Sequence, residues 1–286
     1  MDTVNPSRTI SLGLSSCPND TGIFYALLHK KVQFSLEINY CISDIEELNK
    51  EVIKRNLDVS KISYGVLDRI ADDYVLLRSG SALGRGCGPL ILGREKDMTP
   101  KDLESARIAI PGVHTTAALL LRLYCPGATN LIPMNFAKIA QAVADGDADA
   151  GVIIHETRFV YHKYGLALIR DLGAWWEELT GLPIPLGGIA AKRRLGRNLL
   201  QTLNNALKFS VLYAMNSGLK GEILDFVRRH AQEMSPEVMV NHIKLYVNHY
   251  TVDVGEDGLK AVELLTKATH EKDIFRQEIG SLFIEL

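Results

Sequence analysis

The sequence of 286 residues has little of several features that mark large classes of proteins. Its 32 basic and 34 acidic residues nearly balance, so no net charge attracts nucleic acid or an anionic membrane. No apolar run reaches the roughly 18 residues that a membrane-spanning helix needs, and the N-terminal segment has no apolar core typical of an export signal. We therefore expect a cytoplasmic, unanchored protein without a nucleic-acid partner. The sequence carries no signal of an oligomeric state.

Cysteine is scarce and widely spaced. The four cysteines are Cys17, Cys41, Cys87 and Cys125, and no two of them form a CxxC pair. This spacing excludes a disulfide framework and a structural zinc site of the usual kind, so we expect reduced thiols and no metal. Nothing near Cys17 predicts a lowered thiol pKa, and we interpret that residue as structural or as part of a cleft wall.

Common catalytic motifs are also missing. The glycine-rich segment Gly80–Gly88 has four glycines in nine residues but lacks both the Gly-Lys-Ser/Thr ending of a phosphate loop and the GxGxxG pattern. His155 and Glu156 begin like HExxH, yet Phe159 stands where the second zinc ligand belongs. No G-x-S-x-G elbow is present. These absences argue against nucleotide-phosphate binding, zinc-dependent hydrolysis and the usual serine hydrolases.

Short apolar runs alternate with amphipathic segments along much of the chain. Runs of this kind predict strands at 9–14, 36–41, 107–110, 130–133 and 150–154. Helical spacing predicts helices at 21–30, 45–55, 115–124 and 136–144, the first capped by Asn19 or Asp20 and the second by a capping box of Ser43 and Glu46. Such alternation favours an α/β fold with parallel sheets covered by helices.

The C-terminal third has a different pattern. Apolar residues from Leu199 to Ala214 recur at helical spacing and predict one long amphipathic helix. Further helices are expected from Glu222 and from Ser235, and few strands are expected there.

Two segments are typical of crossings between domains. Pro89–Arg94 follows the glycine-rich segment, and Gly187–Lys192 follows a proline-containing loop. If the chain leaves one lobe at the first and returns at the second, residues 90–186 form an inserted lobe, and residues 1–89 with 187–286 form a discontinuous one. Two such lobes leave a cleft at their boundary, which is a favoured place for a small-molecule site. The alternative is one continuous domain with long loops.

His155 is the first candidate for chemistry in that cleft. It directly follows the apolar run Val152–Ile154, which is typical of a strand buried on both faces. The side chain is therefore expected at the carboxyl edge of a parallel sheet, where open α/β folds bind their ligands. An imidazole there can exchange a proton near neutral pH. The alternative is a histidine that merely ends a strand.

The segment Pro111–Thr116 is a candidate anion site, because it follows a strand and opens a helix whose first backbone N–H groups have no intrahelical partner. The hydroxyls of Thr115 and Thr116 suit a carboxylate or phosphate. Ordinary threonine capping is the open alternative. His114 either donates to the same anion or lies in solvent.

Further polar groups are expected along the cleft. Ser16 and Asn19 lie in the turn after the first strand, and Lys61, Ile62 and Ser63 lead into another strand end. Arg85 within the glycine-rich segment is placed either to pair with a substrate carboxylate or to pair with a neighbouring acid.

Several motifs together resemble one enzyme family, the 1,4-dihydroxy-6-naphthoate synthases, lyases of the futalosine route to menaquinone. The matching pieces are SSCPNDTGIFYAL at Ser15, KISYG at Lys61, LRSGSALGRGCGPL at Leu77, PGVHTTA at Pro111, GVIIHETRF at Gly151, DLGAWWEELTGLPIPLGGI at Asp171 and YVNHYTVDVGEDG near the C-terminus. Two departures lie in the first cleft turn: Ser16 stands where the family commonly has proline, and Gly22 where it commonly has phenylalanine.

The resemblance implies a two-lobed fold like that of type II periplasmic binding proteins, with a ligand cleft between the lobes. It implies a carbon-carbon lyase that converts cyclic dehypoxanthine futalosine, a small carboxylate, to 1,4-dihydroxy-6-naphthoate without a metal or organic cofactor. It also implies that His155 is the proton acceptor. The substrate-binding residues implied by the resemblance are Lys61, Ile62, Ser63, Thr115, Thr116 and Ala117.

Two alternatives stay open from the sequence. The chorismate dehydratase of the same pathway shares the two-lobed architecture and makes a small carboxylate, although the HETRF and GAWWEE segments resemble the synthase. A solute-binding protein of the same fold would bind its ligand without changing it.

Overall fold

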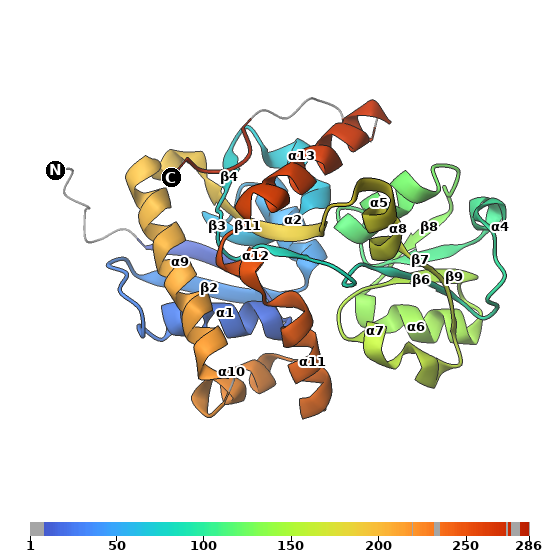
Figure 1. Ribbon diagram of the computed structural model, residues 1–286, viewed down its shortest axis with the longest axis horizontal. Coiled ribbons are helices and arrows are strands. Elements are labelled where there is room, and N and C mark those ends of the chain that lie inside the picture. Colours follow the sequence, from blue (N-terminus) through green and yellow to red (C-terminus); the bar gives the residue numbers. More distant parts are fainter. Residues whose placement is uncertain (1–8, 219, 232–234, 273, 276–280, 286) are drawn as a thin grey trace.

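The structure is a computed structural model that describes residues 9–218, 220–231, 235–272, 274–275 and 281–285. The first eight residues, part of the segment in which no export signal is expected, lie outside the described residues. Two β-sheets with their own helices lie side by side, which gives the molecule the two-lobed α/β form that the sequence predicts (Figure 1). Within the described part of the chain, no helix is long and apolar enough to cross a membrane.

The first sheet has the order β2-β1-β3-β11-β4, with β5 paired to β11. β1 runs parallel to β2 and β3, whereas β11 runs antiparallel to β3, β4 and β5. Its strands are β1 (Ile10–Ser15), β2 (Ile38–Ser43), β3 (Val59–Ser63), β4 (Tyr74–Leu76), β5 (Ala82–Gly84) and β11 (Ile184–Lys192).

Helices from both ends of the chain cover this sheet. The long helix α9 packs against α1, and α10 and α11 also pack against α1 (Figure 1). The helical elements of this lobe are α1 (Pro18–Leu28), α2 (Ile45–Ile53), η1 (Tyr64–Val66), α3 (Leu67–Ile70), η3 (Arg193–Leu195), α9 (Arg197–Ser217), α10 (Glu222–His230), α11 (Pro236–Tyr246), α12 (His249–Val252) and α13 (Gly255–Glu271).

The second sheet has the order β10-β6-β9-β7-β8 and is built from one continuous stretch of chain. β7 runs parallel to β8 and β9, whereas β6 runs antiparallel to β9 and β10. Its strands are β6 (Leu90–Gly93), β7 (Ile108–Ile110), β8 (Leu131–Pro133), β9 (Ala150–Ile153) and β10 (Ala167–Asp171). The helical elements between and after them are α4 (Pro100–Ser105), α5 (Thr116–Tyr124), α6 (Phe136–Asp145), α7 (Thr157–Val160), η2 (Tyr161–Tyr164) and α8 (Leu172–Thr180).

The sheets are mixed rather than all parallel, and this corrects the expectation from strand-helix alternation. The antiparallel members are β6 and β11, which lie in the two segments expected to cross between lobes. β6 is the first strand of the second sheet along the chain, and β11 is the strand with which the chain returns to the first sheet. Each runs against the neighbouring strands of the βα units. Periodicity detects such strands but carries no information on their direction.

Two helix starts also differ from the sequence prediction. Helix α1 begins at Pro18 with Cys17 as its N-cap, and no side chain caps it. Proline tolerates the first helical position because it needs no N–H bond there and its φ is already helical. Helix α2 is capped by Asp44, whose side chain accepts from the backbone N–H of Glu46, rather than by Ser43.

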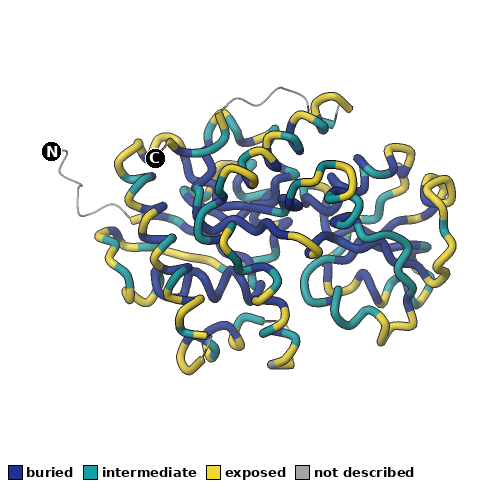
Figure 2. The backbone as a smooth tube through the Cα atoms, in the orientation of Figure 1, coloured by how far each residue is buried: buried dark blue, intermediate teal, exposed yellow. Residues whose placement is uncertain are grey.

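Buried residues occupy the centre of each lobe (Figure 2). Clusters of buried apolar residues fill these centres and also join the lobes. One cluster lies between β1, α1 and α9, and another between β6, β9 and α6. The largest cluster runs across the boundary, because it includes Tyr64 of η1, Leu120 of α5 and Leu265 of α13. The lobes are therefore packed together along the side that carries η1, α5 and α13.

Candidate active site

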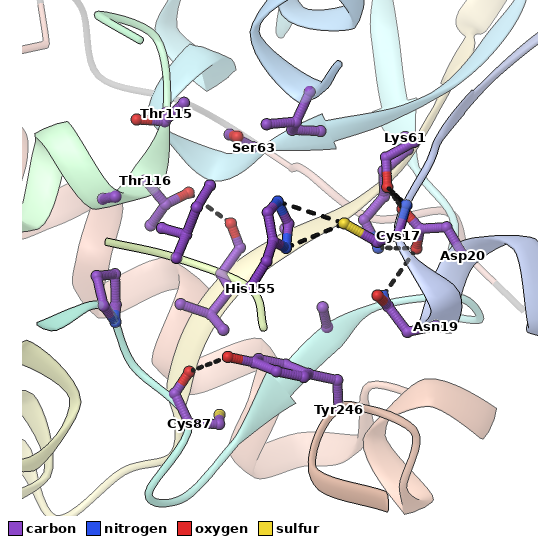
Figure 3. Close-up of a pocket in the computed structure, with 18 of the residues that line it drawn as sticks. Cys17, Asn19, Asp20, Lys61, Ser63, Cys87, Thr115, Thr116, His155 and Tyr246 are labelled. Atoms are coloured by element: carbon purple, nitrogen blue, oxygen red, sulfur yellow. Dashed lines mark hydrogen bonds and ion pairs between the residues drawn. The ribbon is translucent and has the colours of Figure 1, made fainter. Parts of the chain in front are cut away.

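A cavity lies between the lobes where the carboxyl ends of β1 and β3 face those of β7 and β9 (Figure 3). It contains about 640 Å³ of space outside protein atoms, including its opening. This is the place where open α/β sheets bind ligands. The cavity is lined by Ser15, Cys17, Asn19, Asp20, Ile45, Lys61, Ile62, Ser63, Ala82, Cys87, Pro89, Thr115, Thr116, Ala117, Ile154, His155, Leu186, Gly187, His242 and Tyr246.

His155 lies in the turn between β9 and α7 and is central in the cavity (Figure 3). Its backbone φ is 58°, in the left-handed region that costs a residue with a side chain of this size about 1 kcal/mol. The ring stands edge-on to Phe136, with 4.8 Å between the ring centroids. The abrupt end of the strand thus directs the imidazole into the cleft.

Burial lowers the pKa of His155 to about 4, which is the main effect of its surroundings. The negative charge of Asp20 acts in the opposite direction, and the positive charge of Lys61 lowers the pKa further. The imidazole is therefore neutral at physiological pH. A neutral imidazole in a cavity has a lone pair that can accept a proton.

Cys17 contacts the same ring. Its Sγ lies 3.0 Å from Nδ1 and 3.3 Å from Nε2 of His155. Burial, followed by the charges of Asp20 and Glu156, raises the thiol pKa well above its ordinary value. The thiol stays protonated, so this pair is a neutral S–H next to a neutral imidazole and not the thiolate-imidazolium pair of a cysteine nucleophile.

A buried ion pair forms the wall on the side of the first sheet. Nζ of Lys61 lies 2.7 Å from Oδ1 of Asp20, and the two side chains are 6% and 1% exposed. Ser15 donates its hydroxyl to Oδ2 of the same carboxylate at 2.5 Å, and Asn19 donates its amide to Oδ1 at 3.0 Å. Charge pairing and extra donors together offset the cost of burying two ions.

Asn19 extends this wall to the C-terminal helix α11. Its Oδ1 lies 3.1 Å from Nε2 of His242, a side chain that is fully buried. Tyr246, one helical turn further along α11, packs on the His242 ring with 4.6 Å between centroids. The tyrosine donates its hydroxyl to the carbonyl of Cys87.

At the candidate anion site, fewer hydrogen-bonding groups are free to bind an anion than the sequence predicts. The hydroxyl of Thr115 donates to the carbonyl of Gly112 and accepts from the N–H of Ala118, as an N-cap does. Thr116 donates its hydroxyl to the carbonyl of Leu186 and accepts from the N–H of Gly65. The remaining donors at this end of α5 are the backbone N–H groups of its first turn.

Two candidate residues of the cleft lie outside the cavity, and this corrects their expected placement. Ser16 does not line it; the preceding residue, Ser15, points inward at the end of β1 instead. Arg85 is exposed and donates to the carbonyl of Gly181, with Glu177 3.8 Å away, so it pairs with a neighbouring acid. Gly22 borders a separate hollow between α1, α9 and α11.

His114 is also not among the residues that line the cavity, and it borders a separate hollow with Gly65 and Arg69. Its backbone N–H donates to the carboxylate of Glu46, which lies 3.2 to 3.3 Å away and comes from α2 of the other lobe. Asn49 of the same helix donates to the carbonyl of His114 at 3.4 Å. The Pro111–Thr116 segment is thus held against the first lobe.

The structure brings His155 together with all six substrate-binding candidates from the resemblance and with Asn19. Sequence reasoning missed Asp20, Cys87, Pro89, His242 and Tyr246 as parts of the wall. The one local signal for Asp20 in the sequence is that it is an acidic residue in the turn SSCPND. In the described residues, no group of three or more His, Cys, Asp or Glu side chains is arranged to hold a metal ion.

The fold and the cavity define a two-lobed α/β protein with a small-molecule site between its lobes. Several solved structures share this architecture. A protein of Archaeoglobus fulgidus superposes with a TM-score of 0.87 at 32% identity, covering 94% of this chain and 99% of that one. The alkanesulfonate-binding protein SsuA of Xanthomonas axonopodis pv. citri superposes with a TM-score of 0.67 at 14% identity, covering 96% of each chain. The fold is thus that of periplasmic solute-binding proteins.

Sequence comparison defines the family. The menaquinone biosynthesis profile matches residues 10–271. A 1,4-dihydroxy-6-naphtoate synthase of Thermus thermophilus is 44% identical over 97% of this chain and 100% of its own length, and one of Streptomyces coelicolor is 45% identical over 92% and 94%. The chain therefore belongs to the menaquinone biosynthesis family and is an enzyme of the kind that these relatives represent.

Proposed function

We propose that the protein converts cyclic dehypoxanthine futalosine to 1,4-dihydroxy-6-naphthoate, with His155 as the general base. The observation that carries this proposal is a neutral imidazole in the interlobe cavity of a chain related to the named synthases. A base must be unprotonated before it acts, and the lowered pKa of His155 meets this condition at pH 7.

In the proposed reaction, His155 removes a proton from the spirocyclic substrate. The electron pair left behind breaks a carbon-carbon bond, and the ring system becomes aromatic. The imidazolium of His155 then returns its proton to the piece that receives the electron pair of the broken bond, and the sugar-derived fragment leaves. The protonated imidazole is stabilised by the carboxylate of Asp20, whose charge raises the pKa of His155. Lys61 keeps that carboxylate in place.

We propose that the substrate carboxylate binds at the start of α5. Thr115, Thr116 and Ala117, which begin this helix, line one end of the cavity. The first N–H groups of a helix have no intrahelical partner, and the helix dipole favours an anion beside them. Because both threonine hydroxyls already have protein partners, the backbone provides this contact. Ser63 lines the same part of the cavity.

We further propose that residues 90–186 form one lobe and residues 1–89 with 187–286 the other, and that their closure excludes water from the intermediate. The sheet composition supports these boundaries, since β6 to β10 form one sheet and the remaining strands form the other.

The test is to mix purified protein with cyclic dehypoxanthine futalosine and to follow the naphthoate product by mass and absorbance. Formation of the product by the wild type but not by His155→Ala is the expected result. A parallel incubation with chorismate separates the related dehydratase activity. Recovery of the substrate unchanged, although it binds, would instead support a solute-binding protein.

A further inference from the structure

His242 is a cavity residue for which the proposed reaction has no role. It lies on α11, is fully buried and lines the same cavity as His155, with 6.1 Å between the two ring centroids. It belongs to a part of the chain that the sequence pattern presents as a plain helix.

The hydrogen bonds around His242 fix which ring nitrogen carries the proton. Asn19 donates its amide N–H₂ to the carboxylate of Asp20, so its carbonyl oxygen is the atom that faces His242. That oxygen only accepts, and Nε2 of His242 must therefore be the donor. Burial and the nearby His155 lower the pKa of His242 well below its ordinary value, so the ring is neutral and Nδ1 has a lone pair.

This lone pair has no partner in the described part of the protein. Nδ1 of His242 is buried and makes no hydrogen bond there. An unsatisfied buried acceptor is destabilising, and such groups are rare in native proteins. Because the ring borders the cavity, a ligand with a hydroxyl or N–H group is the natural donor.

The other polar groups nearby indicate which part of the ligand reaches this end. Asn19, Asp20 and Lys61 form a linked hydrogen-bonding wall with His242, whereas the α5 end carries the proposed carboxylate site. A dense set of donors and acceptors suits a polyhydroxylated group better than an aromatic ring.

We propose that Nδ1 of His242 accepts a hydrogen bond from a hydroxyl of the sugar-derived part of the substrate. This proposal deepens the proposed function and rests on it. His242 is a substrate-binding residue in this role, and the proton acceptor remains His155.

Two substitutions of similar shape distinguish the contribution of Nε2 of His242 from that of Nδ1. His242→Gln places an amide N–H near the position of Nε2 and keeps the Asn19 contact, but it has no acceptor at the position of Nδ1. His242→Asn places an oxygen near Nδ1 and loses the Asn19 contact. The affinity for cyclic dehypoxanthine futalosine is measured by calorimetry in a His155→Ala background, in which the substrate is expected to bind without conversion. The kcat and KM are measured with His155 present, and circular dichroism checks the fold of each variant.

We expect His242→Gln to weaken substrate binding about tenfold with a smaller change in kcat, whereas His242→Asn stays within about threefold of wild type. The product 1,4-dihydroxy-6-naphthoate lacks the sugar-derived part, so its affinity should be unchanged in His242→Gln. Unchanged substrate affinity in His242→Gln overturns the proposal, and so does an equal loss for substrate and product. A loss in His242→Asn as large as that in His242→Gln also overturns it.

The same measurements keep this proposal distinct from the proposed function. If the wild type binds the substrate without converting it, the proposed function is wrong while the affinities of the variants still decide the role of His242. If the wild type does not bind the substrate, both proposals are overturned.

Discussion

The two walls of the cavity hold their polar side chains in different ways. On the first lobe, Lys61 and Asp20 form a buried ion pair with two further donors on the carboxylate. On the second lobe, His155 is a single neutral ring between a thiol and an aromatic edge. One wall thus has balanced charges held by several bonds, whereas the other exposes one weakly bonded basic group.

The first wall therefore suits a role in holding the substrate, whereas the second wall carries the group that is proposed to react. A network of paired groups resists rearrangement and gives the substrate fixed partners. A base needs a lone pair that is not already used, and burial without strong hydrogen bonds keeps that lone pair available. The Asp20 carboxylate connects the two walls, because its charge raises the pKa of His155 while its hydrogen bonds go to the first wall.

The sharpest test of the comparison is removal of the base. His155→Ala should lower kcat by about 10²- to 10⁴-fold, the usual contribution of a general base, while substrate still binds. Steady-state kinetics and calorimetry measure the two effects. The control is His162→Ala, because His162 is an exposed histidine of the same lobe that does not line the cavity. Near-normal turnover in His155→Ala would remove this residue as the base.

The first wall should respond in stability. Lys61→Met leaves Asp20 as a buried, unpaired carboxylate and should cost about 3–5 kcal/mol of the free energy of unfolding in urea. The double variant with Asp20→Asn should be more stable than Lys61→Met alone. The control is Lys30→Met, which breaks an exposed pair with Glu37 and should cost less than about 1 kcal/mol. Equal losses in the two single variants would contradict the buried network.

The pH dependence distinguishes the neutral ring from an ordinary histidine. Since the base acts unprotonated and its pKa is about 4, kcat/KM should stay level as the pH falls from 7 to 5. Below a pH of about 4 it should fall tenfold per pH unit. The rate profile needs circular dichroism at each pH to show that the protein stays folded. An inflection near pH 6.5 would mean that burial does not control this imidazole.

The smallest effect is expected at the end of α5. Thr116→Val removes two hydrogen bonds, one to Leu186 and one from Gly65, and should cost about 1 kcal/mol of stability and raise KM by a few fold. Thr116→Ser retains the hydroxyl and is the matched control. Arg85→Ala, outside the cavity, should leave KM unchanged. An unaltered KM in Thr116→Val would mean that the bonds of this hydroxyl to Leu186 and Gly65 do not position the helix end for the substrate.

Strand positions follow closely from local sequence where the side chains are buried in apolar runs, as in β1, β7 and β9. The partly exposed strand β10 has no such run and is not among the predicted strands. The run before His155 predicts a strand at 150–154, and the structure has β9 at Ala150–Ile153. Strand direction does not follow, because β6 and β11 run antiparallel through the crossings between lobes. The start of α1 differs from the prediction because Pro18 begins this helix without a side-chain cap. The start of α2 differs because Asp44, next to Ser43, provides the cap.

Only part of the site can be predicted from the sequence, because some of its residues reach the cavity through contacts between distant segments of the chain. His155 follows β9 and Lys61 lies near the end of β3, and strand ends of an α/β fold converge at one edge. His242 and Tyr246 have helical spacing on α11, which does not distinguish a cavity wall from a core face. Their role depends on packing of the C-terminal helix against residues more than two hundred positions earlier, as the contact of Asn19 with His242 illustrates.

The left-handed backbone at His155 also has an evolutionary consequence. A glycine would adopt the φ of 58° without the steric penalty, so relief of the backbone would offset part of the packing lost with the imidazole. Laboratory selection for heat resistance alone should therefore tolerate glycine or asparagine at this position. Selection for growth that depends on the proposed activity should keep the histidine.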